Sequence, residues 1–149
     1  MSTGYCTFHL ADLFMAVPVT EVQEVIRFQE TTHIPLVSDV VNGLINLRGE
    51  IVTTVDLRRR LELEALADDR EPMNVVIRTD EGIVSLLVDE IDDVLELGDE
   101  TLEAPPATLG GVARELISGV HKLDGRLLLV LDTVRMLDLP APALERTSQ

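Results

Sequence analysis

One polar element interrupts an apolar part of the chain and carries a residue type suited to recognition. The run Asn46-Leu47-Arg48-Gly49 lies between Leu44-Ile45 and Ile51-Val52. An arginine in a turn beside glycine presents a rigid fork of N–H donors that matches a carboxylate, and Glu24 is a candidate partner within the chain. Two interpretations stay open and are compatible: the pair is a structural brace, or it shapes a recognition groove.

Carboxylates are abundant, but their spacing does not favour catalysis. They gather in three clusters, Asp68-Asp69-Glu71, Asp89-Glu90-Asp92-Asp93 and Asp99-Glu100-Glu103. General acid and base pairs need a pocket that perturbs the pKa, whereas these clusters fall in segments that we predict to be turns and solvated faces. The second cluster also lacks the loop register and central glycine of an EF-hand calcium loop.

The remaining reactive residue types are scattered. Cys6 is the only cysteine, so no internal disulfide forms, and its place in a strand-like run favours a small buried hydrophobe over a nucleophile. The histidines, at positions 9, 33 and 121, lack metal-ligand spacing, and no glycine-rich phosphate loop is present. We therefore predict a protein that is not an enzyme, with no catalytic residue, no metal and no cofactor.

Length and composition set further bounds. The chain has 149 residues, which allows one domain or two very small ones, and 46% are hydrophobic against 3% aromatic, so the core must be aliphatic. Its net charge of -15 disfavours nucleic acid and anionic membranes and favours a basic partner surface. No signal peptide and no apolar run near 20 residues is present, so we expect a cytoplasmic protein without membrane insertion.

Two segments of similar outline predict β-hairpins. Residues 5–10 and 13–19 are β-prone runs that flank Ala11-Asp12, and residues 74–79 and 83–88 flank Asp80-Glu81-Gly82. Each pair of runs is followed by an acidic segment that ends in apolar residues, and we interpret these two segments, 20–26 and 89–95, as acidic turns.

A stronger repeat lies further along the chain. Residues 43–63 and 119–139 share seven identities in 21 positions, and each copy has a central glycine between two β-prone runs. Asp56 and Asp132 then precede an R-x-L-x-L tail, which predicts a short helix capped by the aspartate.

These elements predict an all-β protein, rich in strands with short helices. Closing each set of strands into a small barrel would remove exposed edges, so we expect two small β-barrels packed together as a pseudo-duplicate. Approximate lobes cover 5–70 and 71–139, with strands allowed to cross between them, and residues 64–72 read as the connection. Residues 98–116 predict an irregular loop ending in a short helix, and 140–149 predict a tail.

The run from Gly43 to Arg58, GLINLRGEIVTTVDLR, closely resembles the signature of the CheW family, the adaptor proteins of chemotaxis. Support extends along nearly the whole chain, through residues 5–19, 22–25, 84–94 and 119–137. The resemblance implies a single CheW-like domain over 1–149, built from two SH3-like five-stranded barrels, with a non-catalytic scaffold role.

The resemblance also implies partners. They are the regulatory domain of a CheA-type histidine kinase and the cytoplasmic tip of chemoreceptors, the methyl-accepting chemotaxis proteins, bound near the groove between the barrels. The adaptor would work in the cytoplasm, associated with membrane receptor arrays through these partners, and would couple receptor state to kinase activity. The kinase contact falls on apolar surface of the first barrel. The residues carried over to the receptor-facing region are Val22, Glu24, Gly43, Asn46, Arg48 and Gly49.

Three positions depart from the family pattern: Thr53 and Ser38 stand where proline is usual, and Ile26 precedes Arg27 where a basic residue is frequent. They leave open a divergent adaptor of a chemosensory system that controls pili or development. A regulator that binds only the kinase is a further alternative. The competing class is a small ligand-binding or enzyme barrel, because a fold does not fix function.

Overall fold

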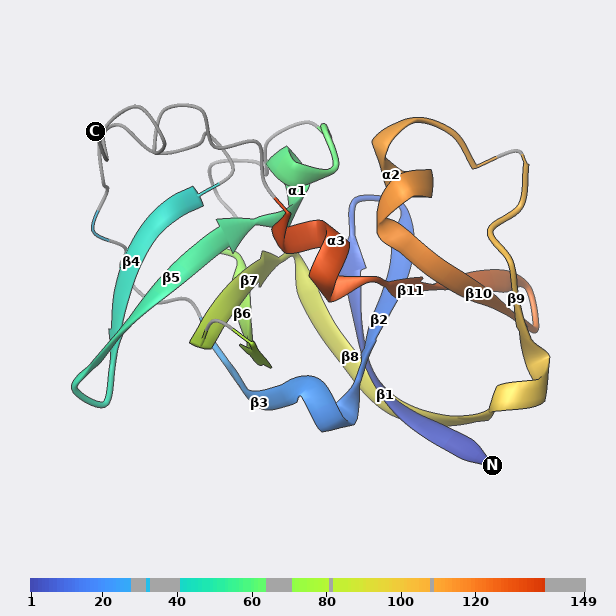
Figure 1. Ribbon diagram of the computed structural model, residues 1–149, viewed down its shortest axis with the longest axis horizontal. Helices are drawn as coiled ribbons and strands as arrows, with labels where there is room; N and C mark the ends of the chain where they lie inside the picture. Colours follow the sequence, from blue (N-terminus) through green and yellow to red (C-terminus); the bar gives the residue numbers. More distant parts are fainter. Residues whose placement is uncertain (28–31, 33–40, 64–70, 81, 108, 139–149) are drawn as a thin grey trace.

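The computed structural model describes residues 1–27, 32, 41–63, 71–80, 82–107 and 109–138, and their strands form two sheets (Figure 1). Sheet A has the order β8-β1-β2-β11-β10-β9, and sheet B has the order β3-β6-β7-β5-β4. The strands of sheet A are Ser2–Leu10 (β1), Leu13–Pro18 (β2), Glu90–Gly98 (β8), Leu102–Glu103 (β9), Ile117–Leu123 (β10) and Arg126–Leu131 (β11). Those of sheet B are Val22–Ile26 (β3), Val41–Leu47 (β4), Glu50–Asp56 (β5), Met73–Thr79 (β6) and Gly82–Val88 (β7).

The two sheets share one strand pattern, which confirms the predicted pseudo-duplication and the all-β class. In each sheet an antiparallel hairpin, β1–β2 or β6–β7, lies beside a second hairpin, β10–β11 or β4–β5. The two hairpins of a sheet meet through a parallel contact, β2 with β11 in sheet A and β7 with β5 in sheet B.

The sequence repeats do not correspond to the sheets. The first repeat supplies β1 and β2 to sheet A but β3, β4 and β5 to sheet B, and the second repeat supplies β6 and β7 to sheet B but the later strands to sheet A. Each sheet therefore combines one hairpin of one repeat with the remaining strands of the other. The two sequence lobes expected at 5–70 and 71–139 each contribute strands to both sheets, as the allowance for crossing strands anticipated. From here on, lobe A means the part of the protein built on sheet A, and lobe B the part built on sheet B.

Local turn chemistry explains the hairpins. Ala11, in the turn between β1 and β2, has φ of 55°, and Gly82, at the start of β7, has φ of 118°, a conformation that glycine adopts without strain. The repeated pair Gly43 and Gly119 marks the same device in both copies, because the β4–β5 ladder shifts register at Gly43 and the β10–β11 ladder shifts at Gly119. At Gly119 a Cβ atom would lie 2.9 Å from the backbone oxygen of Glu103 in β9, so the close approach of β9 to β10 there requires glycine.

The predicted helices are present. Asp56 caps α1 (Leu57–Arg60), where its side chain accepts a hydrogen bond from the Arg59 backbone N–H at 3.2 Å. Asp132 caps α3 (Thr133–Leu137) in the same way, through the Arg135 N–H at 3.0 Å. The remaining short elements are α2 (Gly111–Leu116), the 3₁₀ turn η1 (Val19–Glu21) and the 3₁₀ turn η2 (Asp99–Thr101). The segment 98–116 thus ends in the expected helix but also contributes β9, which was not predicted.

One aliphatic core joins the two lobes. Phe8, Leu10 and Met15 of sheet A belong to the same buried cluster as Ile77 and Leu86 of sheet B, together with Cys6, whose burial was predicted. Because the side chains of both sheets are removed from water together, the lobes fold as one hydrophobic unit.

A second, smaller cluster lies within sheet A, around Tyr5, Phe14 and Leu128. Beside it, His121 is 1% exposed, with Nδ1 2.9 Å from Thr101 Oγ1 and its ring edge against Tyr5. Burial lowers the pKa of His121 and raises the pKa of Tyr5.

Two expectations were wrong. The acidic segments after the first and third hairpins are strands rather than turns: residues 22–26 form β3 and residues 90–98 form β8, because apolar residues recur among the charges and find partners on β6 and β1. Asp89 is not solvated, since its side chain is 7% exposed and paired with Arg58.

The connection at 64–70, the tail at 140–149, His33 and Ser38 lie outside the described residues.

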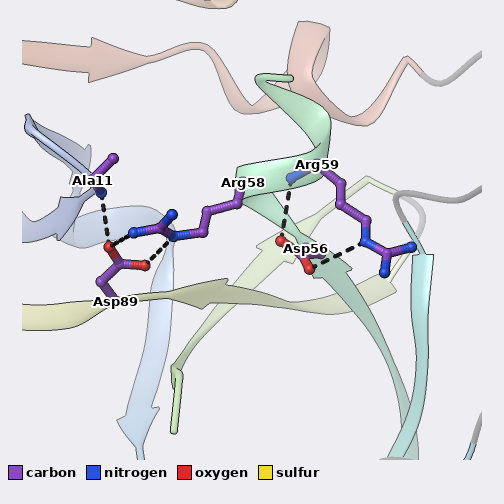
Figure 2. A network of polar contacts seen from close by, with 5 residues as sticks. All are labelled: Ala11, Asp56, Arg58, Arg59 and Asp89. Atoms are coloured by element: carbon purple, nitrogen blue, oxygen red, sulfur yellow. Dashed lines mark hydrogen bonds and ion pairs between the residues drawn. The ribbon is translucent and has the colours of Figure 1, made fainter. Parts of the chain in front are cut away.

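Charged contacts join the lobes where the chain passes from β7 to β8 (Figure 2). Arg58 of α1 donates from Nε to Asp89 Oδ1 at 2.7 Å and from Nη2 to Asp89 Oδ2 at 2.5 Å. The backbone N–H of Ala11 donates to Asp89 Oδ2 at 2.7 Å. One carboxylate therefore ties the α1 helix of lobe B to the first hairpin of lobe A.

Candidate functional site

The turn between β4 and β5 presents Arg48 to solvent. Arg48 and Gly49 have φ of 53° and 86°, the left-handed pair typical of a tight hairpin turn. The Gly49 N–H donates to Asn46 Oδ1 at 2.9 Å, which satisfies a donor that the turn leaves free. The asparagine and the glycine thus hold the loop in which the Arg48 side chain is 72% exposed.

Arg48 reaches Glu24, the partner that the sequence predicted. Its Nη1 lies 2.5 Å from Glu24 Oε2, and the Glu24 side chain is only 17% exposed. Glu24 is on β3 and Arg48 is at the end of β4, which are the two edges of sheet B, so the ion pair links these edges. The hydrogen bond from Arg48 lowers the pKa of Glu24 and raises the pKa of Arg48. Because the pair is open to water, it orients the guanidinium more than it stabilises the fold.

The other predicted site residues belong to the strands and the turn that carry this pair. Val22 is half-buried and packs against the shared core, and the ladder between β3 and β6 shifts register between Val22 and Glu24. Gly43 is buried at the register shift in β4, and its carbonyl accepts a hydrogen bond from Thr54 Oγ1 at 3.1 Å. The structure therefore brings Glu24, Asn46, Arg48 and Gly49 together and places Val22 and Gly43 in the strands that lead to them, β3 and β4.

Sequence reasoning missed two exposed apolar residues on the strands that carry the pair. Ile51 is 61% exposed and directly opposite Asn46 in the β4–β5 ladder, and Val25 is 42% exposed and follows Glu24 in β3. Exposed and half-buried positions alternate along β3, so the Val25 side chain points to the face opposite Glu24, and no local pattern marks it as a site residue. Ile51, by contrast, lies beside the Arg48 turn, and an apolar side chain next to an oriented charge is a composition that protein interfaces share.

A hollow of about 450 Å³ lies where lobe B meets helix α3. It is lined by residues of the β6–β7 hairpin and of α3, including the apolar Val84, Leu137 and Val134, which is 76% exposed. A smaller hollow of about 240 Å³ adjoins it and reaches Glu21, in the turn that precedes β3. Neither Glu24 nor Arg48 lines these hollows, so the charged pair and the apolar hollow are separate features of the protein.

Two carboxylates of the second acidic cluster have structural partners. Asp89 is held by Arg58, and Asp92 Oδ2 lies 2.6 Å from His9 Nε2, a contact that lowers the pKa of Asp92. Across the described part of the chain, no group of three or more His, Cys, Asp or Glu residues is arranged to hold a metal ion. Over the same residues, no helix has both the length and the apolar character needed to cross a membrane.

Comparisons with known proteins place this geometry in a family. Residues 4–141 match the family model described as the CheW-like domain. The chain is 31% identical over 123 residues to the chemotaxis protein CheW of Bacillus subtilis, covering 83% of this chain and 79% of that protein. It is 28% identical over 140 residues to the chemotaxis protein CheW of Klebsiella aerogenes, covering 94% of this chain and 84% of that protein.

A solved structure agrees with the fold. The crystal structure of the scaffolding protein TtCheW from Thermoanaerobacter tengcongensis superposes with a TM-score of 0.83 at 22% identity, over 93% of this chain and 94% of that one. Taken with the family match over almost the whole sequence, the chain belongs to the CheW-like domain family.

Proposed function

We propose that this protein is a non-catalytic adaptor of chemotaxis that couples chemoreceptors to a CheA-type histidine kinase in a signalling array. The observation that carries the proposal is the exposed Arg48, oriented by Glu24 on a CheW-like fold whose curated relatives are chemotaxis proteins. The protein works in the cytoplasm and reaches the membrane only through its partners.

The receptor-facing surface is the one built around Arg48. A helical receptor tip can place an apolar side chain against Ile51 while a carboxylate or carbonyl meets the guanidinium, which is the usual pairing of an apolar anchor with an oriented charge. Val22 and Gly43 hold this surface in shape, and Asn46 and Gly49 fix the turn. We propose that the receptor tip makes a second contact at the apolar hollow between the β6–β7 hairpin and α3, which is separate from the Arg48 surface.

Charge supports association with a partner that is locally basic. The net charge of -15 creates a negative field that accelerates encounter with a basic surface more than it adds affinity. An interface of the smaller, exchangeable class suits an adaptor that joins two partners in an array. The kinase contact uses apolar surface of the chain apart from the Arg48 turn, so the two contacts are separable by mutation.

The experiment is calorimetric titration of the protein with two fragments, the regulatory domain of a CheA kinase and a receptor cytoplasmic tip from the same organism. Arg48→Ala is compared with the parent and with Arg59→Ala, which removes the same charge from a side chain that is 56% exposed on the same lobe. We expect Arg48→Ala to weaken receptor binding about tenfold or more, because arginine is enriched among the few interface residues whose loss costs about 2 kcal/mol or more, and about 1.4 kcal/mol corresponds to tenfold.

Kinase binding should stay within about twofold for both variants, and Arg59→Ala should match the parent in both titrations. Absence of kinase binding at tens of micromolar, about -6 to -7 kcal/mol, would contradict the adaptor proposal. Equal losses for Arg48→Ala and Arg59→Ala would show that only net charge matters and would remove Arg48 from the receptor surface.

A further inference from the structure

Helix α1 contains three consecutive arginines, and two of them reach across to lobe A. Arg58 makes the two-pronged contact with Asp89 that Figure 2 shows, with side chains only 15% and 7% exposed. Asp89 lies between β7 and β8, where the chain leaves sheet B for sheet A, and it also accepts the Ala11 N–H. The contact is therefore a buried joint between the lobes.

Arg60 contacts the end of helix α3. Its Nε donates to the carbonyl of Met136 at 2.7 Å, and its Nη2 donates to the carbonyls of Arg135 and Asp138 at 3.1 and 3.3 Å. The last carbonyls of a helix carry partial negative charge, which favours a guanidinium there. The Arg135 carbonyl also accepts the Asp138 N–H at 3.1 Å, so Arg60 adds a second donor to it. Because α3 follows β11 of sheet A, Arg60 fastens lobe B to lobe A at a second point.

The other end of α3 is also held from outside its own lobe. Thr133 Oγ1 donates to Glu21 Oε1 at 2.7 Å, and Glu21 is the residue immediately before β3 of sheet B. Helix α3 is thus fixed at its first residue by the segment leading into sheet B and at its last turn by Arg60. The hollow between α3 and the β6–β7 hairpin lies within this frame, and Thr133 lines the adjoining hollow that reaches Glu21.

The arginine between the two behaves differently. Arg59 turns to Asp56 of its own lobe, with Nε 3.7 Å from Oδ2. Figure 2 shows Arg58 and Arg59 extending from α1 in opposite directions. The three neighbours therefore offer an internal comparison: Arg58 and Arg60 contact lobe A, whereas Arg59 has among its contacts an ion pair with Asp56 of its own lobe.

We propose that α1 is a brace that sets the orientation of the two lobes, with Arg58 as its buried pivot and Arg60 as the positioning residue that holds α3 and the hollow beside it. Arg60 contacts neither Arg48 nor Glu24, so it would act on partner binding only through the placement of α3. That functional consequence rests on the proposed adaptor role, whereas the brace itself concerns the free protein alone.

The test measures the distance between the lobes in the full chain. Spin labels are attached to Glu50→Cys, at the start of β5, and Asp124→Cys, in the turn between β10 and β11, in a Cys6→Ala background, and pulsed electron paramagnetic resonance gives the distance distribution. Both label positions are exposed. We expect Arg60→Ala to broaden the distribution about twofold, Arg60→Lys to restore part of the parent width, and Arg59→Ala to leave it unchanged.

A parent-like distribution for Arg60→Ala would overturn the brace. Equal broadening by Arg59→Ala would also overturn it, because general loosening of α1 would then explain the result. Thermal unfolding of each variant shows that the lobes stay folded, which is expected because Arg60 is half-exposed and water can reach the carbonyls it leaves.

Titration of the same variants with the receptor tip tests whether the placement of α3 affects receptor binding. A fivefold or greater loss of receptor affinity with Arg60→Ala, with kinase affinity retained, supports that effect. A broadened distance distribution with unchanged receptor affinity refutes the effect on binding but leaves the brace in place. Because the distance measurement needs no partner, failure of the brace and failure of the adaptor proposal give different results.

Discussion

Replacing Asp89 by alanine should destabilise the protein more than any loss of a surface charge. The substitution removes two hydrogen bonds from the Arg58 guanidinium and one from the Ala11 N–H. Breaking a buried ion pair by removing one partner costs about 3 to 5 kcal/mol, because the remaining charge stays desolvated. Since Arg58 keeps 15% of its side chain exposed, we expect the lower end of that range, about 3 kcal/mol.

The assay is urea unfolding at pH 7 with linear extrapolation, supported by thermal unfolding. A loss of about 3 kcal/mol lowers Tm by about 6 to 12 °C in a chain of this size. The double variant Arg58→Met/Asp89→Leu removes both charges, so it should lose less than the sum of its two single variants by about 2 kcal/mol or more. Arg59→Ala, which removes an exposed arginine from the same helix, should change stability by less than about 1 kcal/mol.

An Asp89→Ala loss below about 1 kcal/mol would contradict a buried joint at this position. A double variant whose loss equals the sum of the single losses would contradict it as well. The first result would mean that water or another donor replaces the carboxylate without cost, and the second would mean that Arg58 and Asp89 act independently. Either outcome would mean that the Arg58–Asp89 ion pair does not hold the lobes together.

Two further predictions follow from local features. Asp132→Ala removes the side-chain acceptor at the start of α3 and should cost about 1 kcal/mol in urea unfolding, and Asp132→Asn, which keeps an acceptor, should lose clearly less. His121 makes stability depend on pH: burial lowers its pKa in the folded state, so the unfolded chain binds the proton more readily, and this contribution is present above about pH 6.5 and is lost as the pH falls below it. Urea titrations from pH 7.5 to 5.5 should show a smaller decline for His121→Phe than for the parent, and identical slopes would contradict this role.

Much of the local structure could be predicted because its causes lie within a few residues. The hairpins follow from β-prone runs around short turns, and Asp56 and Asp132 cap helices that begin at the next residue. The Glu24–Arg48 pair was also within reach, because an arginine in a turn beside glycine presents a fork of donors that matches a carboxylate. Its role in binding a partner remains a prediction.

The features that escaped prediction depend on contacts between distant segments. Nothing near Met15 indicates that it will lie beside Leu129 in a parallel pair, yet that register assigns the first hairpin to sheet A. Asp89 looks like its acidic neighbours in sequence, and its burial is decided by Arg58, which lies 31 residues earlier. Exposure of Val25 and Ile51 likewise depends on which strands cover each face of sheet B.

The exchange of hairpins between the two repeats gives the chain the architecture of a domain-swapped dimer joined into one polypeptide. Neither repeat contains all the strands of one sheet, so a half-chain would expose unpaired edges at β2 and β5, or at β7 and β11. If the chain is divided near residue 70, the two halves should therefore associate with each other rather than fold singly. Size-exclusion chromatography of the halves, separate and mixed, would measure their association. In one polypeptide the two copies need not be identical, so the same turn carries Arg48 in one copy and Asp124 in the other, which a symmetric dimer of identical subunits does not allow.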